Sequence, residues 1–134
     1  MISRQFSFKG SILGFEDFDA FDLKEIEGTS FYQLEALDNS EIKFVVINPF
    51  DWKNDYSFIL DNSCKEGLKL NDPNDALVMN IVTIKDPFTS STVNYAAPLV
   101  MNVDNGLAMQ FVIQDNKTYS SKTPLFDAVK EGGE

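Results

Sequence analysis

Carboxylates are the residues whose number and spacing in this sequence suggest chemistry. The chain has 21 Asp and Glu against 11 Lys and Arg, a net charge of −10, and the stretch from Glu16 to Glu41 contains only one base, Lys24. The acids of this stretch are Glu16, Asp17, Asp19, Asp22, Glu25, Glu27, Glu35, Asp38 and Glu41. A glycosidase needs two carboxylates across a cleft, but with so many acids a pair carries no information. The alternatives are a solvated surface and a docking patch for a basic protein.

Other catalytic and cofactor sites are disfavoured by the residues that the sequence lacks. It has no His, which excludes Ser-His-Asp and Cys-His catalysis and His-based metal centres. The lone Cys64 cannot form an internal disulfide, as expected in a reducing compartment. Gly10, Gly14 and Gly28 match neither a dinucleotide fingerprint nor a phosphate-binding loop. We therefore expect no enzymatic activity, no metal and no cofactor.

Charge and hydropathy also limit the partners and the compartment. A strongly negative surface repels phosphate backbones and anionic lipids, so no direct nucleic-acid or membrane contact is expected. No apolar run approaches the roughly 18 residues of a membrane span, and the first residues lack the apolar region of a signal peptide. The sequence predicts a cytoplasmic protein with one domain over residues 1–128 and a polar C-terminal tail over residues 129–134.

The elements that must position these residues are predominantly strands. Short β-branched and aromatic segments recur about every ten residues, separated by Gly, Asn, Asp and Pro, which is typical of an all-β sandwich or barrel. The predicted strands are Arg4–Phe8, Ala20–Ile26, Phe31–Ala36, Glu41–Ile47, Ser57–Leu60, Ala76–Ile84, Thr92–Tyr95, Leu99–Val103, Leu107–Ile113 and Thr118–Ser121. We expect a small, mainly antiparallel β-barrel-like fold of about ten short strands with at most one short helix.

Local patterns refine this expectation. The strand Ala76–Ile84 is apolar on both faces and should lie at the centre, whereas Arg4–Phe8 alternates and should have one wet face. The Asn-Gly pair in residues 104–106 predicts a hairpin with a type I′ turn, and residues 115–117 predict a weaker turn. Ser63 lies three residues before Glu66, a capping-box spacing that predicts a helix over residues 64–70.

Two segments are candidates for recognition. Phe50 and Trp52 follow Pro49 in a predicted loop, so they are better candidates for an exposed interaction surface than the other aromatics. In residues 92–102, Pro98 should mark a strand break, while Asn94 and Asn102 can satisfy backbone groups at bends. This second segment is either a structural corner or a recognition element.

The sequence resembles the family of the flagellar assembly factor FliW. The matching pieces occur in the family's order from about Gly10 to Leu125. They are Leu13-Gly14-Phe15-Glu16 with Phe21 and Leu23, Phe31-Tyr32-Gln33-Leu34, Phe44 to Phe50, Asp55-Tyr56, Met79 to Thr83, and Thr92-Val93-Asn94 with Ala97, Pro98 and Asn102. The sequence departs from the family in two places. Glu35-Ala36 follow Leu34, and Tyr95-Ala96 follow Asn94; in this second place the family usually has Leu and a basic residue.

The resemblance implies a β-barrel-like protein without enzymatic activity that acts through two protein partners. One is flagellin, held in the cytoplasm before export. The other is CsrA, an RNA-binding translational repressor whose grip on flagellin mRNA is relieved when a FliW protein binds it. Rising flagellin would take FliW away and free CsrA, which closes a homeostatic loop.

Three sets of residues follow as predictions from the residues and the resemblance together. For CsrA, which is expected to be basic, the set is the acidic patch Glu16, Asp17, Asp19, Asp22, Glu25 and Glu27; for flagellin it is Pro49, Phe50, Trp52, Tyr56, Thr92 and Asn94; the family motif adds Gly14, Phe15, Pro98 and Asn102. The free protein is expected to be monomeric. The competing class is a cytosolic barrel that carries a small apolar ligand, for which a sizeable closed cavity is expected.

Overall fold

The computed structural model describes residues 3–113 and 118–126, which form a predominantly antiparallel β fold. The described strands are β1 (Ser3–Ser7), β2 (Ala20–Glu25), β3 (Phe31–Ala36), β4 (Lys43–Ile47), β5 (Ala76–Thr83), β6 (Thr92–Val93), β7 (Leu99–Asn102), β8 (Ala108–Gln110) and β9 (Thr123–Pro124). The short helices are α1 (Pro49–Trp52), α2 (Asn62–Gly67) and the 3-10 turns η1 (Pro73–Asp75) and η2 (Phe88–Ser90). The expectation of at most one short helix was therefore wrong.

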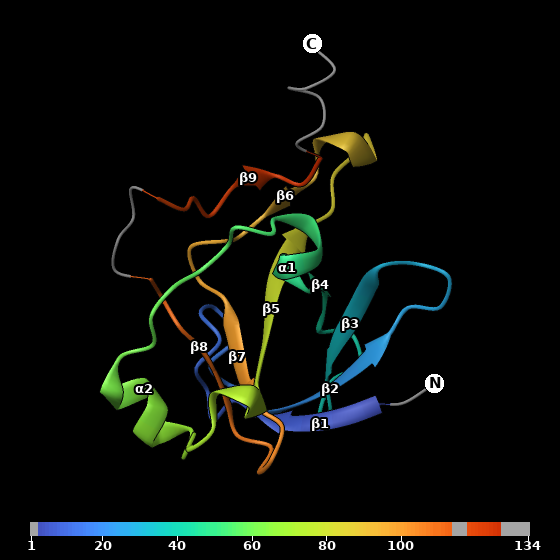
Figure 1. The fold of residues 1–134 in the computed structure, drawn as a ribbon. Coiled ribbons are helices and arrows are strands. Elements are labelled where there is room, and N and C mark those ends of the chain that lie inside the picture. Colours follow the sequence, from blue (N-terminus) through green and yellow to red (C-terminus); the bar gives the residue numbers. More distant parts are fainter. Residues whose placement is uncertain (1–2, 114–117, 127–134) are drawn as a thin grey trace.

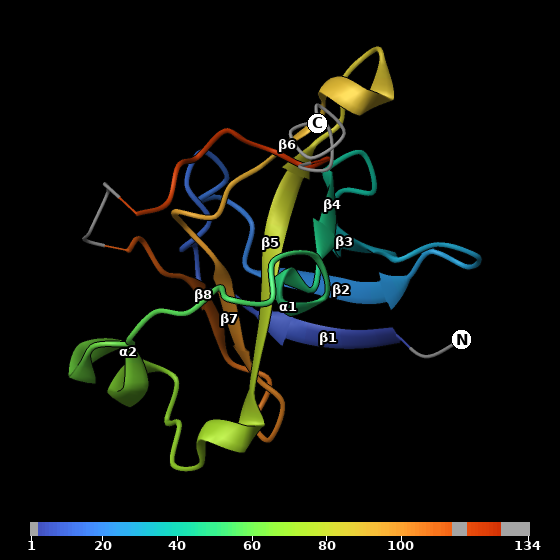
Figure 2. The same cartoon turned by 45° about the horizontal axis from the view of Figure 1, so that its top comes forward.

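Strand β5 is the centre of the fold, as its apolar pattern predicted. Its first half, Ala76–Met79, pairs with β7, and its second half pairs with β4 and β6. The strand order is β1-β2-β3-β4-β5-β6-β9, with β7 and β8 branching from β5. Figure 2 shows β5 running between β7–β8 on one side and β4–β3 on the other. Asn80 and Met79 are both buried although they face opposite sides, because both faces of this strand are covered.

The sheet path is open, but β1 curls back toward the β7–β8 hairpin and makes the fold barrel-like. The amide of Ser7 donates to the carbonyl of Gly106 at 2.8 Å, and the Arg4 guanidinium donates to the carbonyl of Val103. The enclosed core is built around Phe6, Phe8 and other inward side chains of β1 to β5, β7 and β8. Along β1, Phe6 is buried, whereas Gln5 is exposed and Ser7 is half-buried on the opposite face, which confirms the predicted wet face.

Several local expectations differ from the structure. Residues 57–60 and 118–121 are not strands, and β9 starts two residues after the second of these segments. The β7–β8 hairpin exists, but its turn is not type I′, because Gly106 has positive φ (81°) and Asn105 does not. The predicted turn 115–117 and tail 129–134 lie outside the described residues.

Helix α2 begins earlier than predicted because a different residue caps it. The carboxylate of Asp61 accepts a hydrogen bond from the amide of Cys64 at 2.8 Å, whereas Ser63 lies inside the helix. The spacing of Ser63 and Glu66 therefore arose by chance, and the prediction that Ser63 caps the helix was wrong. Among the residues that the structure describes, no helix is long and apolar enough to cross a membrane.

Candidate interaction surfaces

The short helix α1 positions two aromatic side chains, the exposed Phe50 and the half-buried Trp52. Asn48 caps it by accepting a hydrogen bond from the amide of Phe50 at 3.1 Å, and Pro49 occupies the first helical position. Pro49 is buried, and the amide of Lys53 closes the turn on its carbonyl oxygen at 2.8 Å. This geometry holds Trp52 at the C-terminal end of the helix, where it lines a pocket together with residues of β6 and β9.

An open groove of about 560 Å³ lies next to Trp52, and we call it the aromatic groove. Its lining is mainly apolar and consists of Trp52, Lys53, Thr89, Ser90, Thr92, Tyr95, Thr123, Pro124, Leu125 and Phe126. Trp52 contacts Phe31 and Phe126 with ring centroids 5.5 and 6.0 Å apart, and Phe88 contacts both of these phenylalanines. Four rings from β3, α1, η2 and the C-terminal side of β9 therefore meet at one end of the molecule.

The six residues predicted for flagellin do not form one surface. Trp52 and Thr92 line the aromatic groove, whereas Phe50 and Tyr56 border a separate pocket of about 250 Å³. Phe50 is 46% exposed, which confirms the prediction of an exposed aromatic here. Tyr56 and Pro49 are buried and pack beneath the surface residues.

Asn94, the sixth residue, belongs to a buried polar network. Its carboxamide oxygen accepts hydrogen bonds from the amides of Ala96 and Ala97, both at 3.1 Å. Asn80 donates to the carbonyl of Asn94 at 2.9 Å and to the Tyr56 hydroxyl at 3.3 Å, and that hydroxyl donates to the Tyr95 carbonyl at 2.7 Å. Burial raises the pKa of Tyr56 far above its usual value. Asn94 is thus a structural corner under the groove.

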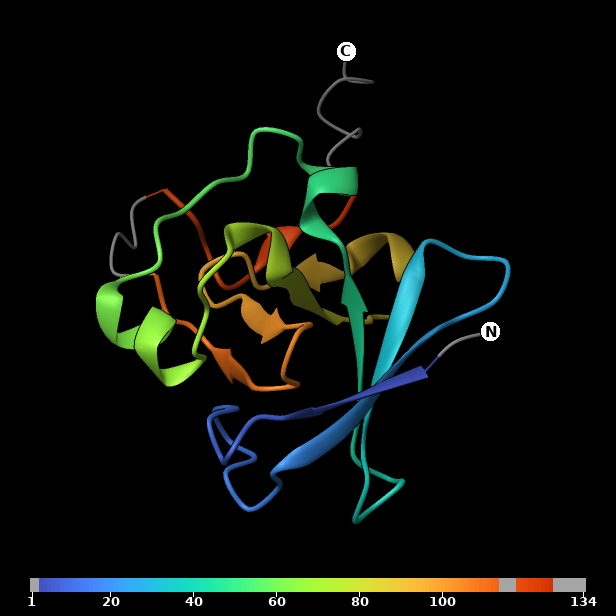
Figure 3. The ribbon, with the colours of Figure 1, turned by 60° about the horizontal axis from the view of Figure 1, so that its bottom comes forward.

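The predicted acidic patch is a stripe that follows β2 from end to end. Glu16, Asp17 and Asp19 lie in the loop before β2, and Glu25 and Glu27 lie at the β2–β3 turn. Figure 3 shows these two loops at opposite ends of β2. Six residues of strand span about 20 Å, so the six carboxylates form an extended acidic stripe and not a compact cluster.

The middle of the acidic stripe contains a carboxylate that lacks a complete set of partners. Asp22 lies opposite Glu35 across β2 and β3, a pairing of like charges. One carboxylate oxygen of Asp22 lies 4.0 Å from the Lys24 ammonium, and the other is buried without a hydrogen bond. Glu35 accepts a hydrogen bond from Gln33 at 3.0 Å. No group of three or more potential metal ligands occurs within residues 3–113 and 118–126.

The four motif residues have structural roles. Gly14 adopts φ +86° in the β1–β2 loop, and the neighbouring Phe15 packs edge-on against Phe44 at 4.9 Å. Pro98 immediately precedes β7, which confirms the expected strand boundary. The carboxamide of Asn102 donates to the carbonyl of Leu68 at 2.9 Å and thereby ties β7 to the end of α2.

Sequence reasoning missed several residues of the aromatic groove. Leu125 and Phe126 line the groove, and Phe31 and Phe88 pack beside it. These residues come from segments far apart in the chain, and only Phe31 belonged to a recognised motif. A Pro-Phe pair in the loop before β6 resembles the Pro-Phe pair that begins α1, and this repetition was the only available indication for Phe88.

Comparisons with known proteins agree on one family. A family model described as FliW protein matches residues 2–125. A flagellar assembly factor FliW from Clostridioides difficile (strain 630) is 36% identical over 118 residues, which cover 87% of this chain and 90% of the relative. Another, from Clostridium novyi (strain NT), is 37% identical over 126 residues, with coverage of 93% and 85%. A crystal structure of the flagellar assembly factor FliW superposes with a TM-score of 0.84 at 34% identity and covers 91% of this chain and 85% of its own.

Proposed function

Because this chain belongs to the FliW family of flagellar assembly factors, we propose that it binds flagellin and antagonises CsrA in the cytoplasm through protein contacts, without catalysis. The observation that carries the proposal is agreement with family members over nearly the whole chain, in both sequence and fold. The two partners would couple flagellin translation to the flagellin level. Two surfaces of different chemistry, one apolar and one acidic, support a protein with two partners.

The aromatic groove is the proposed contact for flagellin. Terminal segments of unassembled flagellin are amphipathic helices, and such a helix buries its apolar face in a hydrophobic groove. Trp52, Pro124 and Phe126 offer that apolar surface, and Thr92 and Thr123 are polar residues of the same lining. Of the six residues first predicted, the proposal retains Trp52 and Thr92 as contacts and assigns the others to support.

A fluorescence titration tests this contact, because Trp52 is the only tryptophan of the chain. Monomeric flagellin should shift Trp52 emission to shorter wavelength as the ring loses water. Trp52→Ala should weaken binding by at least about tenfold, a loss typical of an aromatic anchor at an interface. Leu37→Ala is the control, since Leu37 is 46% exposed and lies away from the groove lining. An unchanged spectrum together with full binding by Trp52→Ala would remove the groove from the proposal.

The acidic stripe is the proposed contact for CsrA. A repressor that binds RNA is expected to be basic, and fixed carboxylates attract it while repelling the RNA. The exposed Asp17 and Asp19 are better test positions than Asp22, whose carboxylate is partly buried. The double reversal Asp17→Lys/Asp19→Lys should lower the association rate by about tenfold at low salt and flatten its salt dependence.

A control with the same change in net charge separates the stripe from overall charge. Asp55→Lys/Glu66→Lys alters exposed acids outside the stripe, and the Lys53–Asp55 ion pair it breaks is exposed and weak. If both double variants slow CsrA association equally, only the net charge matters and the stripe assignment fails.

The two contacts approach each other at one end of the stripe, which supports displacement of one partner by the other. Glu25 ends β2, and the amide of Ile26 donates to the carbonyl of Phe31 at 3.0 Å. Phe31 in turn contacts Trp52 in the aromatic groove. A partner that covers the whole stripe would therefore meet a partner seated in the groove at the β2–β3 turn.

The carrier alternative is less well supported. The aromatic groove is open to solvent, and an apolar carrier needs a largely enclosed cavity. Calorimetric titration with purified CsrA and flagellin decides between the classes. Binding to both, with flagellin displacing CsrA, is expected; binding to neither would leave only the fold and return attention to apolar ligands.

A further inference from the structure

Residues 57–60 have the pattern of a strand but pair with no strand of the described chain. Phe58 and Leu60 turn inward, where Phe58 stacks on Phe111 at 5.9 Å, whereas Ile59 is 88% exposed. This alternation is that of a strand with one covered face. Figure 1 shows the segment as a long extended connection between α1 and α2. No backbone hydrogen bond involves Phe58, Ile59 or Leu60 in the part of the chain that the structure describes.

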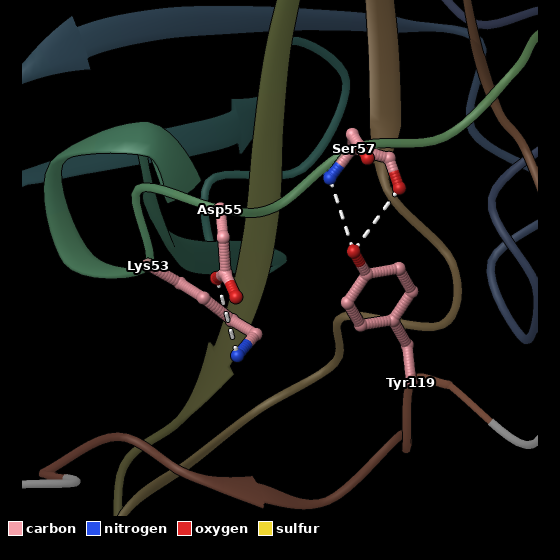
Figure 4. Close-up of polar contacts among 4 residues, drawn as sticks. All are labelled: Lys53, Asp55, Ser57 and Tyr119. Carbon is pink, nitrogen blue, oxygen red and sulfur yellow. Dashed lines mark hydrogen bonds and ion pairs between the residues drawn. The ribbon is translucent and has the colours of Figure 1, made fainter.

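Tyr119 shows which side of this segment is prepared for a partner. The amide of Ser57 donates to the Tyr119 hydroxyl at 3.0 Å, and that hydroxyl donates to the carbonyl of Ser57 at 3.1 Å (Figure 4). The hydroxyl thus occupies the place of a neighbouring strand's backbone. In a strand, the N–H and C=O of one residue point to the same side, and residues two apart share that side. The N–H and C=O of Ile59 should therefore face the same way as those of Ser57.

The space on that side is an open groove of about 500 Å³. It is lined by Ser57, Phe58, Ile59, Asp61, Phe111, Ile113, Thr118 and Tyr119. The pocket on the opposite side of the segment, of about 250 Å³, is lined instead by Phe50, Tyr56, Ser57, Phe58, Leu60 and Val78. Ile59 and Asp61 thus line only the first of these pockets and Leu60 only the second, whereas Ser57 and Phe58 border both.

From these contacts we infer that residues 57–61 receive an added β-strand from a partner protein, in the groove beside Tyr119. The strand pairs with the N–H and C=O of Ile59 and the N–H of Asp61, and places alternate apolar side chains against Phe111 and Ile113. This contact is separate from the aromatic groove and the acidic stripe, and it goes beyond the proposed function.

Charge decides the chemistry of the occupant. Among the described residues that line the groove, Asp61 is the only charged one, and it lies at one end of residues 57–61. A strand with Lys or Arg next to this carboxylate is complementary to it. A second copy of this chain fits poorly, because pairing two such segments brings together two molecules of net charge −10. The occupant is thus an extended apolar segment with a basic residue at the end that meets Asp61, and Lys at both ends of a test peptide allows for either strand direction.

The test uses the full chain labelled with ¹⁵N and the capped peptide Lys-Val-Thr-Val-Thr-Val-Lys at up to about 1 mM, a range that detects weak binding. Amide shifts should appear at Ile59 and Asp61, and their hydrogen exchange should slow at least about tenfold at saturation. The amides of Phe58 and Leu60 should keep exchanging fast, because they face the other side. The same peptide with Glu in place of both Lys should bind at least about tenfold more weakly.

Two variants of the exposed Ile59 separate the contribution of its backbone N–H to peptide binding from that of its side chain. Ile59→Pro removes the N–H, so the peptide should bind at least about tenfold more weakly. Ile59→Ser keeps the N–H and should bind within about threefold of the parent. A peptide N-methylated at its central valine repeats the test from the other partner, so it stays decisive if Ile59→Pro fails to fold.

Several outcomes would overturn the inference. These are no amide shifts at the highest peptide concentration, protection at Phe58 and Leu60 instead of Ile59, and full binding by the N-methylated peptide. Equal binding of the acidic peptide would refute the basic occupant. A dimer in sedimentation that Ile59→Pro dissociates would show that a second copy occupies the groove.

Discussion

At the scale of single residues, Gly10 shows how the absence of a Cβ can determine the conformation of the loop that carries Asp17 and Asp19. It adopts φ +76°, and a Cβ there would lie 2.9 Å from the carbonyl oxygen of Glu16. Both conditions favour glycine, because a left-handed conformation and a backbone clash act together. The loop before β2 is thus held in one conformation by backbone packing.

Gly10→Ala should lower the free energy of unfolding by about 2 kcal/mol, more than either effect alone. Gly28→Ala is the matched control, since Gly28 has a similar φ of +79° but nothing within 4 Å of its added Cβ. Urea unfolding of both variants measures the difference. If both variants lose the same free energy of unfolding, the contact of the added Cβ with the carbonyl oxygen of Glu16 does not destabilise the protein.

Cys64 provides a second prediction at this scale. Burial raises the pKa of its thiol to about 11, with a smaller contribution from the Asp61 carboxylate, and its Sγ lies 3.1 Å from the Met109 Sδ. Between about pH 9 and 11 the unfolded chain would lose this proton while the folded chain keeps it. The thiol's contribution to stability is therefore present below pH 9 and is lost as the pH rises to 11.

Unfolding measured from pH 8 to 11 should thus show a steeper loss of stability for the parent than for Cys64→Ala. This comparison isolates the thiol from Tyr56, whose raised pKa acts in the same direction in both proteins. The parent thiol should also react slowly with thiol reagents at pH 8 in the folded state. Parallel pH profiles would contradict the buried, protonated thiol.

At the scale of elements, α2 illustrates how a cap chooses the start of a helix. Asp61 caps the amide of Cys64, and Leu68 and Lys69 close the other end by donating to the carbonyls of Cys64 and Glu66. The carbonyls of Leu68 and Lys69 also accept from Asn102, so the helix is anchored to β7 at its C-terminal end. Its N-terminal side, capped by Asp61, adjoins residues 57–60.

Asp61→Ala should cost about 1 kcal/mol of stability, the usual value of an N-cap, and Asp61→Asn should cost only a fraction of this. Ser63→Ala, at the cap position that the sequence pattern suggested, should change stability by less than about 0.5 kcal/mol. Thermal unfolding of the three variants measures these effects. A larger loss at Ser63 than at Asp61 would contradict the observed cap.

At the scale of the whole molecule, the arrangement of the two proposed contacts determines how the partners compete. The acidic stripe runs along β2 and the loops at its two ends (Figure 3). The β2–β3 turn leads into Phe31, whose ring contacts Trp52 of the aromatic groove. Overlap at this end makes displacement a matter of shared space. A conformational change transmitted through β5 is not required.

Direct overlap predicts a distinctive titration. The apparent Kd for CsrA should rise in proportion to the flagellin concentration without reaching a limit, since a site that is occupied cannot bind. Coupling between separate sites would instead give a plateau, because its strength is finite, typically 5–150-fold. Competition titrations at several flagellin concentrations distinguish the two, and a plateau would refute overlap.

Much of this fold follows from local patterns in the sequence. Phe31–Ala36 was predicted at its observed bounds, and β1, β2, β4 and β5 within two residues, because the alternation and β-branching that identify a strand are properties of neighbouring residues. The family motifs and the concentration of acids before Glu41 were likewise visible in the sequence alone. The same local criteria also indicated residues 57–60 as a strand, and what separates them from one is that they pair with no strand among the residues that the structure describes.

What only the tertiary structure decided is which residues share a surface. Pro49, Phe50, Trp52 and Tyr56 are close in sequence, but a helical turn sends their side chains to two pockets and to the core. Phe31 and Phe126 are distant in sequence and both contact Trp52, and Phe88 contacts both of these phenylalanines. The physical reason is that periodicity is set by adjacent residues, whereas burial and contact depend on strand pairing across the whole chain.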